Sequence, residues 1–109
     1  MSANRIYERV CIVGAGLVGS SLARALKRAD AAGEINVFDA DAAVRARALE
    51  LGFADAAPET LSDAADGADL VVIATPMGAI AGVVEALKPC LAPGATVTDV
   101  GSVKSPVAA

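Results

Sequence analysis

A glycine-rich turn with no spacer on either side is the feature that most constrains how this chain can fold. The apolar run at residues 10–13 leads directly into Gly14, Ala15, Gly16, Leu17, Val18 and Gly19. Apolar residues then recur at helical spacing, at Val18, Leu22 and Leu26. A buried strand that passes at once into a helix is the opening of a β-α-β unit, in which the helix packs back on the sheet.

The rest of the chain alternates between strand and helix patterns. Short apolar runs predict strands at 7–13, 35–38, 70–74 and 95–100, with a short edge strand around Phe53 and Ala54. Helices are expected from 18 to a stop at Gly33, over 42–51 with Asp41 as N-cap, over 60–65, from Thr75 and Pro76 onward, and after Gly101. This order predicts a three-layer α/β/α fold of Rossmann type, with a parallel sheet in the order 3-2-1-4-5 that stops before its remaining strands.

Size and charge restrict the class of protein. The chain has 109 residues, 55% of them hydrophobic, which suits one domain with a genuine core. Its net charge of -4 argues against a nucleic-acid partner or an anionic membrane surface and favours a small metabolite. The sequence shows no leader and no apolar run of about 18 residues, and its two cysteines form no CxxC pair, so we expect a cytoplasmic protein.

The glycines have the GxGxxG spacing of a dinucleotide-binding turn. Gly14 would allow the tight turn, Gly16 the approach of a pyrophosphate, and Gly19 the close packing of helix on strand. The alternative is that these glycines only form a turn. Asp39 favours the dinucleotide, because it closes the second strand twenty residues after Gly19, where a carboxylate can accept hydrogen bonds from the ribose hydroxyls.

The cofactor expected at this turn is NAD. The carboxylate of Asp39 would repel the additional phosphate of NADP, which makes NADP the less favoured dinucleotide. Arg45 and Arg47 lie six and eight residues after Asp39, and we assign them to the solvent-facing side of their helix rather than to a phosphate site.

The segment TDVGSVK at residues 98–104 resembles a signature of the prephenate and arogenate dehydrogenase family. The resemblance extends over GAGLVGSSLARALKR, VFDAD, ALELGFAD and ADLVVIATP. It implies that residues 1–109 are the NAD-binding part of a longer homodimeric enzyme whose C-terminal helical dimerisation domain is absent here. The implied reaction is oxidative decarboxylation of prephenate to 4-hydroxyphenylpyruvate, or of arogenate to tyrosine, in tyrosine biosynthesis.

The resemblance also implies roles for individual residues. Ser102 would be the catalytic residue of this part of the chain, placed near the substrate hydroxyl, although an ordinary N-cap is the other interpretation. Ala74, Thr75 and Pro76 would line the cofactor channel. Lys104 is assigned no catalytic role.

The chain departs from the family pattern in having no histidine. The catalytic histidine of the family follows on the next strand, and general-base assistance is worth about 10²- to 10⁴-fold in rate. We therefore expect residues 1–109 to bind cofactor but to catalyse no reaction alone. Two alternatives stay open: a stand-alone NAD-binding or regulatory module, and a dehydrogenase or reductase of a neighbouring Rossmann family.

The assignment of Asp39 predicts that the chain binds NAD more tightly than NADP. Asp39→Asn removes the charge that repels the additional phosphate, so it should erode this preference. Calorimetric titration of the unmodified chain and the variant with both dinucleotides measures the effect. Tighter binding of NADP by the unmodified chain would refute the assignment.

Overall fold

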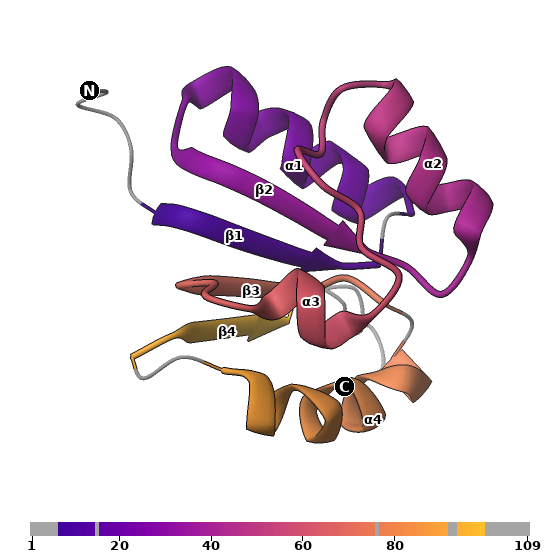
Figure 1. Ribbon diagram of the computed structural model, residues 1–109, viewed down its shortest axis with the longest axis vertical. Coiled ribbons are helices and arrows are strands. Elements are labelled where there is room, and N and C mark those ends of the chain that lie inside the picture. Colours follow the sequence, from indigo (N-terminus) through magenta and orange to yellow (C-terminus); the bar gives the residue numbers. More distant parts are fainter. Residues whose placement is uncertain (1–6, 15, 76, 92–93, 100–109) are drawn as a thin grey trace, which may run out of the picture.

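The computed structural model describes residues 7–14, 16–75, 77–91 and 94–99 (Figure 1). Its elements are β1 (Tyr7–Val13), α1 (Leu17–Ala29), β2 (Ala32–Phe38), α2 (Ala42–Glu50), α3 (Leu61–Ala65), β3 (Leu70–Ile73), α4 (Met77–Leu87), the short 3₁₀-helix η1 (Lys88–Cys90) and β4 (Thr96–Asp99). The expected succession of strands and helices is confirmed over these residues, whereas the helix expected after Gly101 lies outside them.

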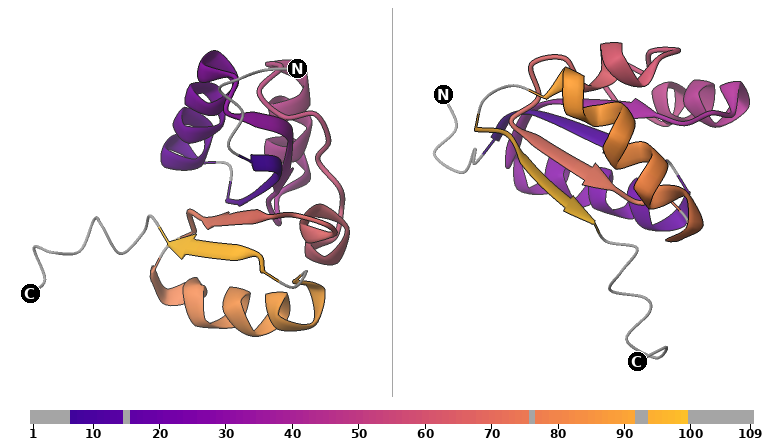
Figure 2. Two further views of the ribbon diagram at one scale, coloured as in Figure 1. Left: turned by 90° about the vertical axis from the view of Figure 1, so that its left-hand side faces the viewer. Right: turned by 90° about the horizontal axis from the view of Figure 1, so that it is seen from below.

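The strands form one parallel sheet in the order β2-β1-β3-β4. Val13 at the end of β1 is level with Phe38 at the end of β2 and with Ile73 at the end of β3. Ile73 is in turn level with Asp99 of β4, so the carboxyl ends of the strands meet at one edge. Figures 1 and 2 show α1 and α2 on one face of the sheet and α3 and α4 on the other. The predicted three-layer fold is confirmed.

The core has two halves because successive residues of a strand point to opposite faces. Val10 and Ile12 of β1 pack in the cluster that contains Ala23 of α1 and Ala48 of α2. The intervening Cys11 belongs to the other cluster. That second cluster includes Val13, Ala64, Ala65, Val71, Ile73 and Leu87. A strand buried on both faces needs a continuous apolar run, which is the pattern seen in the sequence.

The predicted edge strand at Phe53 and Ala54 is reduced to a single contact. Both residues are buried, but the chain meets β2 only through an isolated parallel bridge between Asn36 and Ala56. The Val37 amide donates to the Ala56 carbonyl at 2.9 Å. The segment thus occupies the outer place of the order 3-2-1-4-5 without forming a strand.

The predicted stop of the first helix at Gly33 is wrong. The helix α1 ends at Ala29, and Asp30 adopts a left-handed conformation with φ 55° as its C-cap. Aspartate is one of the few residues other than glycine that visits this region readily. The Ala31 amide then donates to the Leu26 carbonyl at 3.0 Å, and Gly33 lies inside β2.

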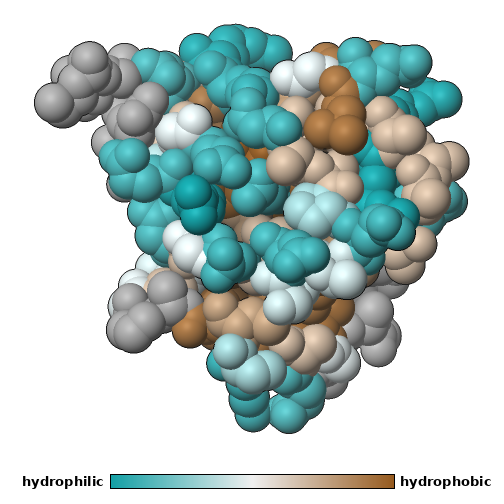
Figure 3. Space-filling model, viewed as in Figure 1, coloured by the Kyte–Doolittle hydropathy of each residue, from teal (hydrophilic) through white to brown (hydrophobic). Residues whose placement is uncertain are grey.

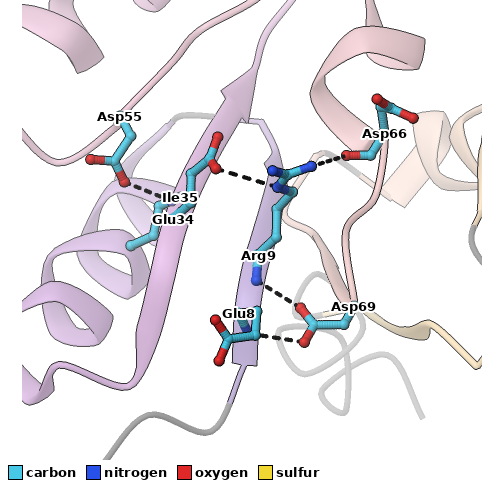
Figure 4. Close-up of polar contacts among 7 residues, drawn as sticks. All are labelled: Glu8, Arg9, Glu34, Ile35, Asp55, Asp66 and Asp69. Atoms are coloured by element: carbon cyan, nitrogen blue, oxygen red, sulfur yellow. Dashed lines mark hydrogen bonds and ion pairs between the residues drawn. The ribbon is translucent and has the colours of Figure 1, made fainter. Parts of the chain in front are cut away.

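Asp69 joins β1 to β3 at the end of the sheet opposite the glycine turn (Figure 4). Its carboxylate accepts hydrogen bonds from the amides of Glu8 and Arg9, both at 2.9 Å. Its own amide donates to the Arg9 carbonyl at 2.9 Å. One aspartate therefore satisfies three backbone groups before the ladder between the two strands begins.

Asp55 makes a similar connection to β2. Its Oδ2 accepts from the Ile35 amide at 2.7 Å, and its Oδ1 from the Lys27 ammonium group at 3.1 Å. The segment that replaces the edge strand is thereby tied to both β2 and α1. Hydrogen bonds from backbone amides to these carboxylates stabilise the fold. Neither Asp69 nor Asp55 lies at the carboxyl edge of the sheet.

Asp69→Ala should destabilise the fold by about 1 to 2 kcal/mol, because it leaves the Glu8 and Arg9 amides without their acceptor. Asp66→Ala is the matched control, since Asp66 accepts a hydrogen bond from Arg9 through its backbone carbonyl, which the substitution keeps. Urea unfolding followed by circular dichroism measures both variants. Equal unfolding midpoints for the two would contradict the role assigned to the Asp69 side chain.

Candidate functional site

Gly14 begins the turn that follows β1, and the chain itself requires glycine there. Its φ of 98° is a conformation that side chains disfavour. A Cβ would lie 3.0 Å from the Ala74 carbonyl carbon and 3.1 Å from Thr75 Cγ2. The Gly14 amide donates to the Phe38 carbonyl at 2.7 Å, so the ends of β1, β2 and β3 converge on this residue.

Gly19 lies in the first turn of α1 and is also required by packing. A Cβ at Gly19 would overlap the carbonyl oxygen of Gly14 and lie 3.3 Å from Ile12 Cγ2. The start of α1 can approach the end of β1 this closely only because Gly19 lacks a side chain. The tasks expected of the first and third glycines are thus visible in the chain's own contacts.

Gly16 is different, because nothing in the described structure occupies the space of its missing side chain. A Cβ built there meets no atom within 4 Å, and the residue is exposed with an ordinary φ of -74°. Gly16 is the N-cap of α1 and offers no side chain to the amides of the first turn. The first turn of α1 contains no acidic residue that would oppose an anion. Ala15 lies outside the described residues, as do the side chains of Leu17 and Val18.

Asp39 follows β2 directly and is half-buried. Its Oδ1 accepts from the Asp41 amide at 2.9 Å, and Asp41 caps α2 by accepting from the Ala43 amide at 2.9 Å, which confirms the predicted N-cap. Arg45 donates from Nη1 to the Asp39 carbonyl at 2.7 Å. Arg45 is half-buried through this contact, whereas Arg47 is exposed as expected.

Ala74 and Thr75 follow β3 at the same edge. The Ala74 amide donates to the Val13 carbonyl at 2.8 Å, which holds this turn against the end of β1. The Oγ1 of Thr75 is buried and has no hydrogen-bond partner among the described residues. Leaving a buried hydroxyl without a hydrogen-bond partner costs free energy, and a ligand that supplied a partner would remove that cost. Pro76 and Ser102 lie outside the described residues.

The structure also contains a hollow that the sequence did not indicate. It has a volume of about 400 Å³ and is lined by Gly16, Ser20, Ser21, Arg24, Val44, Arg47, Leu51 and Phe53. The guanidinium of Arg24 lies 5.4 Å from the centre of the Phe53 ring. Side chains from α1 and α2 meet here only after folding, so no local pattern could have marked them as neighbours. The surface in Figure 3 is largely hydrophilic, with smaller apolar patches.

The described residues offer little support for a cysteine nucleophile, a metal site or a membrane-spanning helix. Burial raises the pKa of the Cys11 thiol to about 12, with a further contribution from nearby Cys90, so this thiol stays protonated and is a poor nucleophile. Among the described residues no group of three or more His, Cys, Asp or Glu side chains is arranged to hold a metal ion. Nor does any helix in those ranges have the length and apolar character needed to span a bilayer.

Relatives of known function match this chain. A cyclohexadienyl dehydrogenase of Zymomonas mobilis is 35% identical over 99 residues, which are 91% of this chain and 34% of the relative. A prephenate dehydrogenase of A. aeolicus, solved with hydroxyphenyl propionate and NAD+, aligns with a TM-score of 0.78 at 29% identity, over 84% of this chain and 32% of the other. Synechocystis arogenate dehydrogenase aligns with a TM-score of 0.77 at 32% identity, over the same shares.

The chain spans about a third of the length of these relatives. All three are dehydrogenases by name. Residues 22–109 match a family described as the nucleotide-binding domain of prephenate dehydrogenase. This match covers most of the chain, from α1 through the segment that carries TDVGSVK. The chain therefore belongs to the prephenate dehydrogenase nucleotide-binding domain family.

Proposed function

We propose that this chain binds NAD across the glycine turn and forms the cofactor half of a dehydrogenase that acts on prephenate or arogenate. The observation that carries the proposal is the contrast among the glycines. Gly14 and Gly19 are required by contacts within the chain, whereas the space at Gly16 is open. A pyrophosphate in that space explains why the middle position is also a glycine.

The pyrophosphate would bind to the amides at the start of α1. Gly16, Leu17 and Val18 would offer backbone N–H groups there, and the positive end of the helix dipole favours an anion. Ala15, which lies outside the described residues, is proposed to join them. Among the described residues no atom lies within 4 Å of a Cβ built at the exposed Gly16.

Asp39 is proposed to bind the adenosine ribose. It follows the end of β2, and the Phe38 carbonyl just before it accepts a hydrogen bond from Gly14, so the backbone of Asp39 lies next to the glycine turn. A carboxylate accepts hydrogen bonds from ribose hydroxyls and repels a 2′-phosphate, which favours NAD over NADP. The structure of the A. aeolicus relative with NAD+ supports the same choice.

Thr75 is proposed to face the cofactor, together with Ala74 and Pro76. Two observations support this position: Thr75 Cγ2 lies 3.1 Å from a Cβ built at Gly14, at the edge where the strands end, and Oγ1 has no hydrogen-bond partner among the described residues. In open α/β sheets this edge is where ligands bind.

NAD supplies an acceptor for the hydride that leaves the substrate ring when the hydroxyl-bearing carbon is oxidised. Ser102 is proposed to orient that hydroxyl; it follows three residues after Asp99, which is level with Ile73 at the same edge. The 109 residues contain no histidine, the side chain that ordinarily titrates near neutral pH. We propose that the proton acceptor, the groups that bind the substrate carboxylates and a dimer interface are supplied by another part of the enzyme, as the family resemblance implies.

Gly16→Val should abolish NAD binding while preserving the fold, because the branched side chain fills the space assigned to the pyrophosphate. Gly82→Val is the matched control, since Gly82 is also exposed with no atom within 4 Å of a built Cβ. Calorimetry measures binding, and circular dichroism verifies folding. A folded Gly16→Val variant that binds NAD like the unmodified chain would show that the turn is not the phosphate site.

The 109-residue chain should form no NADH from NAD in the presence of prephenate or arogenate, because it lacks the proton acceptor. A longer protein that continues from this domain should show the reaction in the absorbance of NADH. Activity of the short chain alone, or inactivity of the longer protein with both substrates, would contradict the proposal. Binding of NAD without activity in the longer protein would instead favour a regulatory module.

In that longer protein, Ser102→Ala should lower kcat by about tenfold or more while changing the affinity for NAD little, because the serine is proposed to face the substrate. Ser105→Ala tests a serine of the same segment and serves as control. An equal loss in NAD affinity and kcat would place Ser102 on the cofactor side.

A further inference from the structure

Arg45 makes a contact that the proposed function does not use. It lies near the start of α2, is half-buried, and donates from Nη1 to the backbone carbonyl of Asp39 at 2.7 Å. Arg47, two residues further along the same helix, is exposed and lines the hollow between α1 and α2. Of these two arginines, Arg45 donates a hydrogen bond to the backbone of the loop after β2, whereas Arg47 lines the hollow.

The loop that carries Asp39 is closed by its own hydrogen bonds. The Asp39 carboxylate accepts from the Asp41 amide at 2.9 Å, and the Asp41 carboxylate accepts from the Ala43 amide at 2.9 Å. The Asp41 carbonyl accepts from the amides of Val44 and Arg45, both at 3.1 Å. The backbone of Arg45 therefore holds Asp41, and its side chain holds Asp39.

The peptide groups around Asp39 are held from two sides. On one side the Phe38 carbonyl accepts from Gly14 at 2.7 Å, which ties β2 to the glycine turn. On the other side the Asp39 carbonyl accepts from the guanidinium of Arg45, a charge-assisted hydrogen bond of the stronger kind. Arg45 thus adds a second hold on Asp39, at its carbonyl, beside the hydrogen bond that the carboxylate accepts from the Asp41 amide.

We propose that Arg45 is a positioning residue that orients Asp39 for ribose binding and thereby sets the preference for NAD. This inference rests on the proposed function, because it requires Asp39 to be the ribose acceptor. An arginine close to this acidic position can instead bind the 2′-phosphate of NADP. The geometry favours positioning, because the guanidinium donates at 2.7 Å to a carbonyl of the chain itself.

The two roles differ in which dinucleotide responds to Arg45→Met. Positioning predicts NAD binding about tenfold weaker and a smaller ratio of NAD to NADP affinity, a loss typical of coupled neighbours. Arg28→Met removes the same charge from an exposed position in the last turn of α1, which does not line the hollow, and should change NAD affinity less than about twofold, as expected for an exposed charge. Calorimetry gives both affinities, and circular dichroism and the thermal midpoint verify the fold of each variant.

A double-mutant cycle tests whether Arg45 acts through Asp39. In an Asp39→Asn background, Arg45→Met should weaken NAD binding by less than about twofold, because the carboxylate that it orients is already altered. Arg45→Lys, which keeps the cation but not the forked donor, should fall between the unmodified chain and Arg45→Met. It also supplies the comparison if Arg45→Met does not fold.

Several outcomes would overturn the inference. NADP binding weakened by Arg45→Met with NAD binding unchanged would identify a phosphate site instead. The same loss with and without the Asp39 carboxylate would show that Arg45 acts independently of it. Failure of the unmodified chain to bind either dinucleotide would remove the proposed function itself, and this inference with it, whereas normal NAD binding by Arg45→Met refutes only the positioning role.

Discussion

The close approach of Gly19 to Gly14 is the constraint on which the arrangement of this domain depends. There is no room for a Cβ between the first turn of α1 and the carbonyl oxygen of Gly14. Because the helix begins so near the end of β1, its amides face the edge where β2 and β3 also end. A side chain at Gly19 would push the helix away from the strand and separate its N-terminus from Asp39 and Thr75.

Polar contacts are divided between the two ends of the sheet. At one end Asp69 accepts from backbone amides near the start of β1, while Asp55 accepts from the Ile35 amide in the middle of β2. At the other end Asp39 is held through its carbonyl and one carboxylate oxygen, and Thr75 Oγ1 has no partner in the described ranges. Stability and the proposed binding chemistry are thus supported by different aspartates, so substitutions at one end can be interpreted separately from those at the other.

The family assignment and the site geometry answer different questions. Similarity over most of the chain shows which family it belongs to, but the relatives are about three times as long. The geometry explains why the middle glycine is free for a ligand, which a family name does not explain. Ser102, the residue proposed to face the substrate, lies outside the described residues, so its proposed role rests on the resemblance alone.

The sequence by itself determined the alternation of strands and helices, the parallel order of the sheet, the Asp41 cap and the family. These features depend on local patterns: buried strands need continuous apolar runs, and a helix start needs an acceptor within a few residues. Tertiary structure alone decided the end of α1 at Asp30, the single bridge at Ala56, and the inward turn of Arg45 to the Asp39 carbonyl. The bridge at Ala56 depends on which amide a distant segment brings within reach. The cap at Asp30 and the hydrogen bond of Arg45 join residues close in sequence, but helical spacing says nothing about a left-handed cap or about a long side chain that folds back on the loop before its own helix.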